Sequence, residues 1–434
     1  MGLCQPRTSR GQDGLPGFGQ PGRWRRSWFA GVGHRPCAHA ESSGPAAGSS
    51  PGGGPGRPTR DGRVVCLCSS LLAAGLPGYP ANSGPAWLGW LVHGRLAVVF
   101  FLVLSGFSLA ISAARDGWRV GGLIPFARRR AWRIMPPYWA ALGFSLVIAW
   151  ALVPASRLGP PTGRSVVVYG LLLQDVATAP TPNLAFWSIA VEAELYLTLP
   201  LLVLIRRRLG AVMLLVCATL PVVMLGLLTP DGALVKGSTG LAVQLAPVFA
   251  AGVAAAGVLV ASERIRRLPW HWLAAGGAAP VLLLILLNGP VWTVDHYFWI
   301  DLAVGPAMAM LLMAVATGRP VALVRLLGTR PVRGLGTFSY SLYLIHLPII
   351  LIISRMVVAP RLAPGLTAFW VTLVLGLPIS LMTARFFAMV FEVPFVRHRS
   401  WKHLLSAARP AATTATARRH GGLRTSSSGR GEPN

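Results

Sequence analysis

The sequence has few acidic residues and almost no lysine. Of its 434 residues, 13 are Asp or Glu and 40 are Lys or Arg, and the lysines are Lys236 and Lys402. Charged residues account for 12% of the chain and hydrophobic residues for 53%. A soluble globular domain usually has about 25% charged residues, so this composition excludes an ordinary water-soluble fold.

Cysteine is also scarce. The five cysteines are an odd number without the spacing of metal ligands or of a redox pair: Cys4, Cys37, Cys66, Cys68 and Cys217. This pattern excludes a disulfide framework and a zinc site. We expect no metal site and no permanently bound cofactor.

The net charge of +27 comes almost entirely from arginine. A basic chain can bind nucleic acid, but its basic residues then gather in one domain or on one face. Here they stand between apolar runs, as expected for arginines retained on the cytoplasmic side of a membrane. The sequence therefore predicts a membrane protein with no nucleic-acid partner.

Three parts of the chain differ in composition. Residues 1–62 and 399–434 are rich in small and polar residues and lack apolar periodicity, so both are predicted to be disordered. Residues 64–76 form a weak candidate for a transmembrane span, because this stretch is short for about 30 Å of hydrocarbon. The predicted fold of residues 63–398 is an all-α bundle of about ten transmembrane helices. Its nine firm spans are 89–112, 135–155, 185–205, 211–229, 241–261, 270–288, 299–317, 337–358 and 366–390.

Arginine clusters predict the orientation. The connections that contain several arginines are assigned to the cytoplasm, namely those around 128–133, 206–208, 264–267 and 319–333. With these assignments both termini are cytoplasmic, and we expect a multi-pass protein of the plasma membrane. The apolar piece 165–176 does not fit the alternation, so it is predicted to be a re-entrant or interfacial segment on the outer side.

Polar residues inside apolar segments are functional candidates because they are costly in hydrocarbon. The first group is FFLVLSGFSLA (100–110), in which Ser105, Gly106 and Phe107 interrupt a helix preceded by His93 and Arg95. The pair of small residues indicates either a notch where two helices approach closely or a functional serine with a base nearby.

The second group is RRRAWRIMPPYW, with Arg130 and Arg133 on one face of a helical turn. Two guanidinium groups there could bind a diphosphate through paired hydrogen bonds. The alternative is a plain topology signal, since we expect the arginines at 206–208 to gather at a membrane face without a ligand.

The third group is FWSIAVEAELYLTLP (186–200), in which Ser188, Glu192 and Tyr196 share a face and Glu194 points elsewhere. A carboxylate within a span suits proton transfer or the orientation of a histidine. The alternative is a carboxylate paired with arginine for folding alone.

The fourth group is FSYSLYLIHLPI (338–349), in which Tyr340, Tyr343 and His346 form one helical stripe. A neutral imidazole in the membrane could act as a base or as a hydrogen-bond relay. The alternative is a histidine held by a tyrosine or serine of a neighbouring helix.

In this order the four groups resemble the membrane-bound acyltransferase-3 family, and FEVPF (391–395) is similar to the Glu-x-Pro that closes its last helix. The resemblance covers about residues 87–398. It implies transfer of an acetyl or other short acyl group from acyl-CoA to a hydroxyl. The acceptor would be a sugar, polysaccharide, lipid or glycosylated metabolite, so the expected partners are acyl-CoA, a carbohydrate or glycolipid acceptor and membrane lipids.

The resemblance also implies roles for individual residues. Catalysis is expected of His346, Glu192, Ser105 and Tyr343. Acyl-CoA is expected to meet Arg130 and Arg133, with Arg129 beside them. The acceptor is expected to meet Trp187, Ser188, Tyr196 and Tyr340.

The sequence departs from the family in its first helix, which in the family carries an arginine and a histidine regarded as the base. The stretch RDGRVVCLCSSLLAAGL has Arg63 but no histidine. We expect a misassigned or frameshifted start upstream of about Ser69, and the alternative is a degenerate member. His346 is better placed than His93 to replace the missing base, with Glu192 to hold the imidazolium.

Two other classes of function remain open at this point. A transporter or flippase could move a lipid-linked sugar or a small anion through the same polar cavity, without consuming acyl-CoA. A catalytically degenerate membrane subunit would explain the absent histidine.

Overall fold

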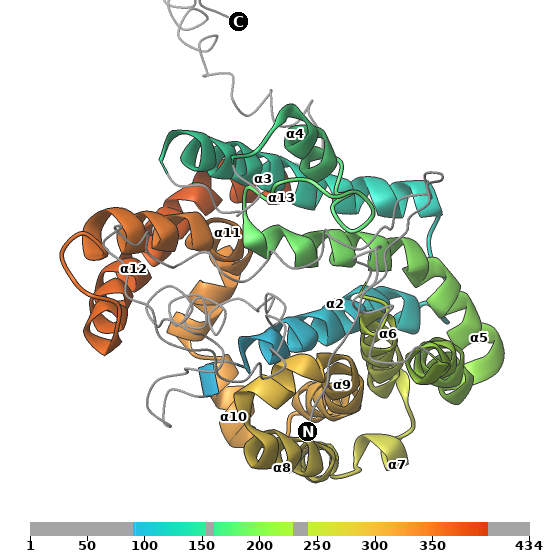
Figure 1. Cartoon of the computed structure of the whole chain (residues 1–434). Helices are drawn as coiled ribbons and strands as arrows, with labels where there is room; N and C mark the ends of the chain where they lie inside the picture. Colours follow the sequence, from blue (N-terminus) through green and yellow to red (C-terminus); the bar gives the residue numbers. More distant parts are fainter. Residues whose placement is uncertain (1–89, 92, 153–159, 229–241, 398–434) are drawn as a thin grey trace, which may run out of the picture.

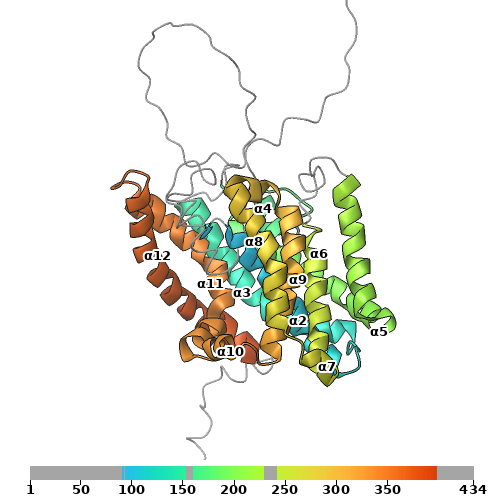
Figure 2. The same cartoon turned by 90° about the horizontal axis from the view of Figure 1, so that it is seen from below.

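The computed structural model describes residues 90–91, 93–152, 160–228 and 242–397, and these residues form helices and connections without a strand. Figure 1 shows the helices around a common interior, and in Figure 2 most of the long helices run in roughly one direction. The two predicted disordered segments and the weak span at 64–76 lie outside the described residues.

The first half of the bundle is built mainly from three long helices, α2, α3 and α5. Its elements are α2 (Arg95–Arg115), α3 (Leu123–Ala151), α4 (Gly163–Gly170), η2 (Leu184–Phe186), α5 (Trp187–Leu228), α6 (Leu245–Ala255), η4 (Ala256–Val260) and α7 (Glu263–Arg266).

The second half contains four more long helices, two of which continue as short π-helical segments. Its elements are α8 (Trp270–Asp295), α9 (Tyr297–Ala316), α10 (Val321–Leu327), α11 (Arg330–Ile352), η5 (Ile353–Val358), α12 (Leu366–Phe387), η6 (Ala388–Glu392) and α13 (Val393–Arg397).

Seven helices of the described chain are long and apolar enough to cross a membrane, and the shorter apolar helix Leu245–Val260 is an eighth candidate. One of the seven, Leu184–Leu228, has 45 residues and contains two of the predicted spans. The described part of each of the nine firm spans thus falls largely on a helix. The prediction of an all-α multi-pass membrane bundle is confirmed, whereas the count of ten remains a prediction.

The two arms of α5 meet at Gly210, which has φ 90° and ψ −179°. A positive φ is readily adopted by glycine, so one helical arm can end here and the next can begin in a different direction. Figure 1 shows the sharp bend of α5 that results. The arginines at 206–208 lie directly before this bend, where the sequence predicted a connection between two spans.

The apolar piece 165–176 does not form a span. Its helix α4 has 8 residues, which is far fewer than the ~20 needed to cross hydrocarbon. The hydroxyl of Tyr138 donates to the carbonyl oxygen of Tyr169 at 2.7 Å, and the indole of Trp139 donates to that of Gly170 at 2.9 Å. The piece is therefore a short helix held against α3, and its outer location stays a prediction.

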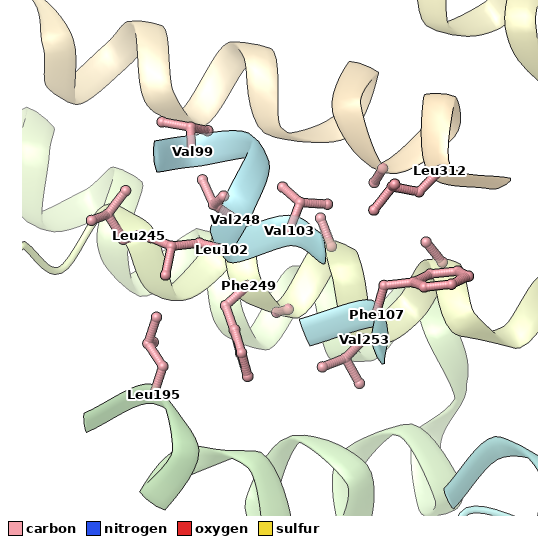
Figure 3. Packing of buried hydrophobic residues seen from close by; sticks show 14 of the residues in the cluster. Val99, Leu102, Val103, Phe107, Leu195, Leu245, Val248, Phe249, Val253 and Leu312 are labelled. Atoms are coloured by element: carbon pink, nitrogen blue, oxygen red, sulfur yellow. The ribbon is translucent and has the colours of Figure 1, made fainter. Parts of the chain in front are cut away.

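Two hydrophobic clusters form the interior, one among α3, α11 and α12 and the other among α2, α5, α6 and α9. Figure 3 shows part of the second cluster, with Val103 and Phe107 of α2 beside Phe249 of α6. A Cβ on Gly106 would lie 2.3 Å from the carbonyl oxygen of Phe249, and one on Gly252 would lie 2.0 Å from that of Val103. The Ser-Gly notch therefore does allow two helices to approach closely.

Candidate active site

Ser105, Glu192 and Tyr196 form one buried polar cluster between α2 and α5. The Ser105 hydroxyl donates to Oε1 of Glu192 at 3.1 Å and lies 3.3 Å from the Tyr196 hydroxyl. The Tyr196 hydroxyl donates to the same Oε1. Glu192 and Tyr196 meet because they are four residues apart on α5. The notch that brings α2 close therefore also places the serine beside a carboxylate.

Arg130 of α3 lies close enough to this cluster for charge interactions with Glu192 and Tyr196. Its guanidinium group also stands over the ring of Phe126, at 5.9 Å from the centroid. Within the described chain, no carboxylate forms an ion pair with Arg130. This leaves a positive group at the edge of the cluster with capacity to bind an anion.

Arg129 and Arg133 lie on the exposed surface of α3, whereas Arg130 is only partly exposed. The three arginines that the sequence grouped for binding acyl-CoA thus differ in exposure, although Arg129 and Arg133 lie close enough to Arg130 for charge interactions. Arg130 belongs to the rim of the polar cluster, and the other two extend the positive surface outward along α3.

Ser188, Tyr343 and His346 form a second buried polar cluster, between α5 and α11. The hydroxyl groups of Ser188 and Tyr343 are 2.6 Å apart, and the Tyr343 hydroxyl donates to the carbonyl oxygen of Ala185 at 2.9 Å. The rings of Tyr343 and His346 have centroids 5.8 Å apart. Ser188 and Glu192 are one turn apart on α5, so this helix connects the two clusters.

The orientation of His346 follows from its own helix. Its Nδ1 lies 2.8 Å from the carbonyl oxygen of Tyr343 and 3.2 Å from that of Leu342. Two acceptors at Nδ1 favour the tautomer with a proton on this nitrogen, which makes Nε2 the basic nitrogen. The side chain is completely buried. His346 is therefore suited to act as a neutral base.

Some of the predicted site residues contact partners other than those that the sequence predicted. Glu192 was expected to support His346, but its hydrogen bonds go to Ser105 and Tyr196. Tyr340 donates to the carbonyl oxygen of Ile134 at 3.2 Å and so joins α11 to α3. Their roles in binding or catalysis stay predictions.

Trp187 belongs to a polar arrangement that the sequence analysis missed. Arg95 donates to Oδ2 of Asp301 from Nε at 2.9 Å and from Nη2 at 2.6 Å, and its guanidinium group stands over the rings of Trp187 and Tyr297. The ion pair is buried, and Asp301 has no exposed surface. The signal in the sequence was one acidic residue inside the apolar segment YFWIDLAVG.

The sequence did not predict the contacts of two further buried polar residues, Asn183 and Glu392. Asn183 donates to the hydroxyl of Ser145 at 3.2 Å and to the carbonyl oxygen of Leu344 at 2.8 Å. Glu392, from the FEVPF motif, accepts from the hydroxyl of Ser341 at 2.6 Å. Both join segments that are far apart in the sequence.

His93 lies just before α2, and its Nδ1 is buried without a hydrogen-bond partner in the described chain. Burial lowers the pKa of its imidazole below the usual value, because the charged form loses its hydration. Among the described residues, no group of three or more His, Cys, Asp or Glu is placed to hold a metal ion.

The arrangement combines hydroxyl groups, a carboxylate, an imidazole and a guanidinium group inside an apolar bundle. Hydroxyl groups can donate to a carbonyl oxygen, and imidazole can accept a proton from an alcohol. These are the groups that acyl transfer to an alcohol requires.

Comparison with known proteins agrees with this chemistry. The family model described as "Acyltransferase domain" matches residues 64–385. Acyltransferase MdmB of Streptomyces mycarofaciens is 27% identical over 355 residues, which cover 76% of this chain and 86% of that protein. No solved structure matches the chain. Because the family match spans most of the sequence and includes all four motif groups, the chain belongs to the acyltransferase-3 family of multi-pass membrane acyltransferases.

Proposed function

We propose that the chain transfers an acetyl or other short acyl group from acyl-CoA to a hydroxyl of a sugar, polysaccharide, lipid or glycosylated metabolite. The observation that carries the proposal is the hydrogen-bonded cluster of Ser105, Glu192 and Tyr196, with Arg130 close enough for charge interactions with Glu192 and Tyr196. Arg130 forms no ion pair with a carboxylate of the described residues, so it can face the negative charge that develops on the thioester carbonyl oxygen, to which the adjacent hydroxyl groups can donate.

The donor would bind from the cytoplasm, with Arg130 beside its thioester and with the exposed Arg133 and Arg129 adding positive charge along the path of its phosphates. The arginine-rich connections support this side, because they are retained in the cytoplasm. The same rule supports an orientation with both termini cytoplasmic, and we propose the plasma membrane as the location. The acceptor would contact Trp187, Ser188, Tyr196 and Tyr340.

In the reaction, Nε2 of His346 would take the proton of the acceptor hydroxyl as the oxygen attacks the thioester carbonyl carbon. Ser105 and Tyr343 would turn their O–H groups from Glu192 Oε1 and the Ala185 carbonyl oxygen to the thioester carbonyl oxygen as it gains negative charge. Glu192 would keep the hydrogen bond that it accepts from Tyr196. When the carbon–sulfur bond breaks, the imidazolium returns the proton to the leaving thiolate, so the products are an ester and free CoA.

The test measures transfer of a radiolabelled acetyl group from acetyl-CoA in membranes that contain the chain. The proposal predicts labelled ester and an equal amount of free CoA. A transporter or flippase would move a labelled lipid-linked sugar and leave the thioester intact. A degenerate subunit would do neither unless its first helix were replaced by one with a histidine.

A further inference from the structure

Arg206 differs from its neighbours in the cluster at 206–208. Arg207 and Arg208 are exposed, whereas Arg206 is partly buried with its guanidinium group 4.4 Å from the ring centroid of Trp118. Its Nε is buried and has no hydrogen-bond partner in the described chain. No carboxylate of the described chain forms an ion pair with it. The topology rule explains an arginine at this membrane face but not one turned inward.

Trp118 reaches Arg206 from an unusual backbone conformation. It lies in the connection between α2 and α3 with φ 60°, directly after Gly117 with φ 58°. Its backbone N–H donates to the carbonyl oxygen of Ala113 at 2.6 Å, which fixes the turn to the end of α2. A bulky side chain rarely adopts a positive φ, and such residues cluster at sites of function.

Gly257 of η4 provides the space for this pair. A Cβ on Gly257 would lie 3.1 Å from Nη2 of Arg206 and 3.5 Å from Cζ2 of Trp118. Both side chains therefore rest against bare backbone, and a larger residue would displace them. Three separate elements, the α2–α3 connection, α5 and η4, contribute to the arrangement.

The pair lies on the same hydrophobic cluster as the candidate active site. Trp118, Phe126 and Tyr196 all pack against that cluster, and Phe126 is the ring beneath Arg130. Arg206 is fourteen residues beyond Glu192 on α5, which corresponds to about 21 Å along a helix. An extended pantetheine arm covers a comparable length, with the thioester at one end and the nucleotide at the other.

We infer that Trp118 and Arg206, seated on Gly257, bind the nucleotide end of the acyl-CoA donor. The indole offers a face on which adenine can stack. The guanidinium group offers hydrogen-bond donors to the phosphates. The inference rests on the proposed function, because it identifies where the far end of the same donor binds.

The test compares binding of two donors to the full chain in phosphatidylcholine nanodiscs, where no anionic lipid phosphate competes. Acetyl-CoA carries the nucleotide and acetyl-pantetheine lacks it. Arg206→Gln and Trp118→Leu should each weaken acetyl-CoA binding about 10-fold, which corresponds to about 1.4 kcal/mol. Neither variant should change the binding of acetyl-pantetheine. Equal weakening of both donors, or of neither, would overturn the inference.

Arg207→Gln is the matched control, because it removes the same charge from the adjacent exposed position. It should leave the dissociation constants of acetyl-CoA and acetyl-pantetheine unchanged. If it weakened acetyl-CoA binding as much as Arg206→Gln does, the effect would come from the overall positive charge and not from Arg206. Gly257→Val keeps both side chains but fills the space against which they pack. It should therefore also weaken the binding of acetyl-CoA and not that of acetyl-pantetheine. This variant keeps the inference testable if Trp118→Leu does not fold.

Adenosine 3′,5′-bisphosphate provides a readout that is independent of the thioester. It should displace acetyl-CoA from the unaltered chain and from Arg207→Gln, and it should bind about 10-fold more weakly to Arg206→Gln. Binding of this nucleotide by a chain that transfers no acyl group would contradict the proposed function but support the nucleotide site. Displacement that does not depend on Arg206 would contradict the site. The same measurements in phosphatidylglycerol nanodiscs complete the test. If the site binds lipid headgroups instead, acetyl-CoA binding should be lost there in the unaltered chain and in every variant.

Discussion

Glu192 accepts two hydrogen bonds inside the bundle and lies close enough to Arg130 for a charge interaction, without a direct ion pair between them. Glu192→Gln keeps the size of the side chain but removes the charge that positions Ser105 and balances Arg130. We expect its kcat for acyl transfer to fall about 100-fold, within the range of groups that assist proton transfer. Steady-state kinetics in membranes would measure this.

Glu194→Gln serves as the control for that variant, because Glu194 lies on the same helix outside the polar cluster. It should keep the activity of the unaltered chain. If the two variants lost activity equally, the effect would come from the helix and not from the cluster.

The ion pair between Arg95 and Asp301 is expected to stabilise the fold. Asp301→Ala would leave the guanidinium group buried without its carboxylate, and removing one partner of a buried pair costs about 3–5 kcal/mol. Thermal unfolding in detergent should show a large loss of stability. Glu263→Ala, which removes an exposed carboxylate bound by Arg266 and Arg267, should cost less than about 1 kcal/mol. Similar stability of the two variants would refute the structural role of Asp301.

For single residues, spacing along the chain predicted which side chains belong to the candidate site better than it predicted which side chains they contact. Glu192 with Tyr196 and Tyr343 with His346 follow from helical period, and the structure places each pair together. The placement of Ser105 and His346 in two separate polar clusters could not be predicted, because contacts between helices depend on how each helix is rotated about its axis. Asp301 was missed since it belongs to no motif.

The contact between α2 and α6 depends on two glycines that allow backbone to touch backbone. Gly252→Ala would place a methyl group 2.0 Å from the carbonyl oxygen of Val103, so the helices would have to separate. We expect a loss of stability of at least about 1–3 kcal/mol, as for other overpacked interiors. Size-exclusion chromatography of the detergent extract after heating would measure it.

Gly276→Ala in α8 is the control for this substitution, because a Cβ there meets nothing within 4 Å. It should be neutral or slightly stabilising, since alanine favours a helix more than glycine does. A neutral Gly252→Ala would mean that α2 and α6 are not in such close contact.

Helix positions could be predicted because the thickness of hydrocarbon fixes the length of an apolar run. The break within α5 could be predicted as well, since the arginines at 206–208 indicated a connection and Gly210 directly after them has non-helical φ and ψ. The inward turn of Arg206 was missed, because it depends on Trp118 from another element.

The arginine distribution predicts which connections face the cytoplasm. Ser262 lies in the connection between η4 and α7, which is predicted to be cytoplasmic. Thr178 lies just after the piece 165–176, which is predicted to be outside, and both residues are exposed. In intact cells a membrane-impermeant maleimide should label Thr178→Cys and leave Ser262→Cys unlabelled. Labelling of both positions after the cells are opened is the control. The reverse pattern in intact cells would invert the orientation and with it the side from which the donor binds.

For the whole molecule, the family and the membrane bundle could be predicted because five motifs occur in order along the chain. The route from donor to acceptor could not, since it depends on how separate helices place Arg130, Ser105 and His346 relative to one another. The structure assigns these residues to clusters that α5 connects, and the account requires that both clusters act on one thioester.

The most direct test of that requirement is transfer of labelled acetyl from acetyl-CoA by the reconstituted chain and by an Arg130→Ala, His346→Ala double variant. The account predicts formation of labelled ester by the unaltered chain, and a loss of at least about 100-fold in the double variant. Normal transfer by the double variant, or an intact thioester with the unaltered chain, would contradict it.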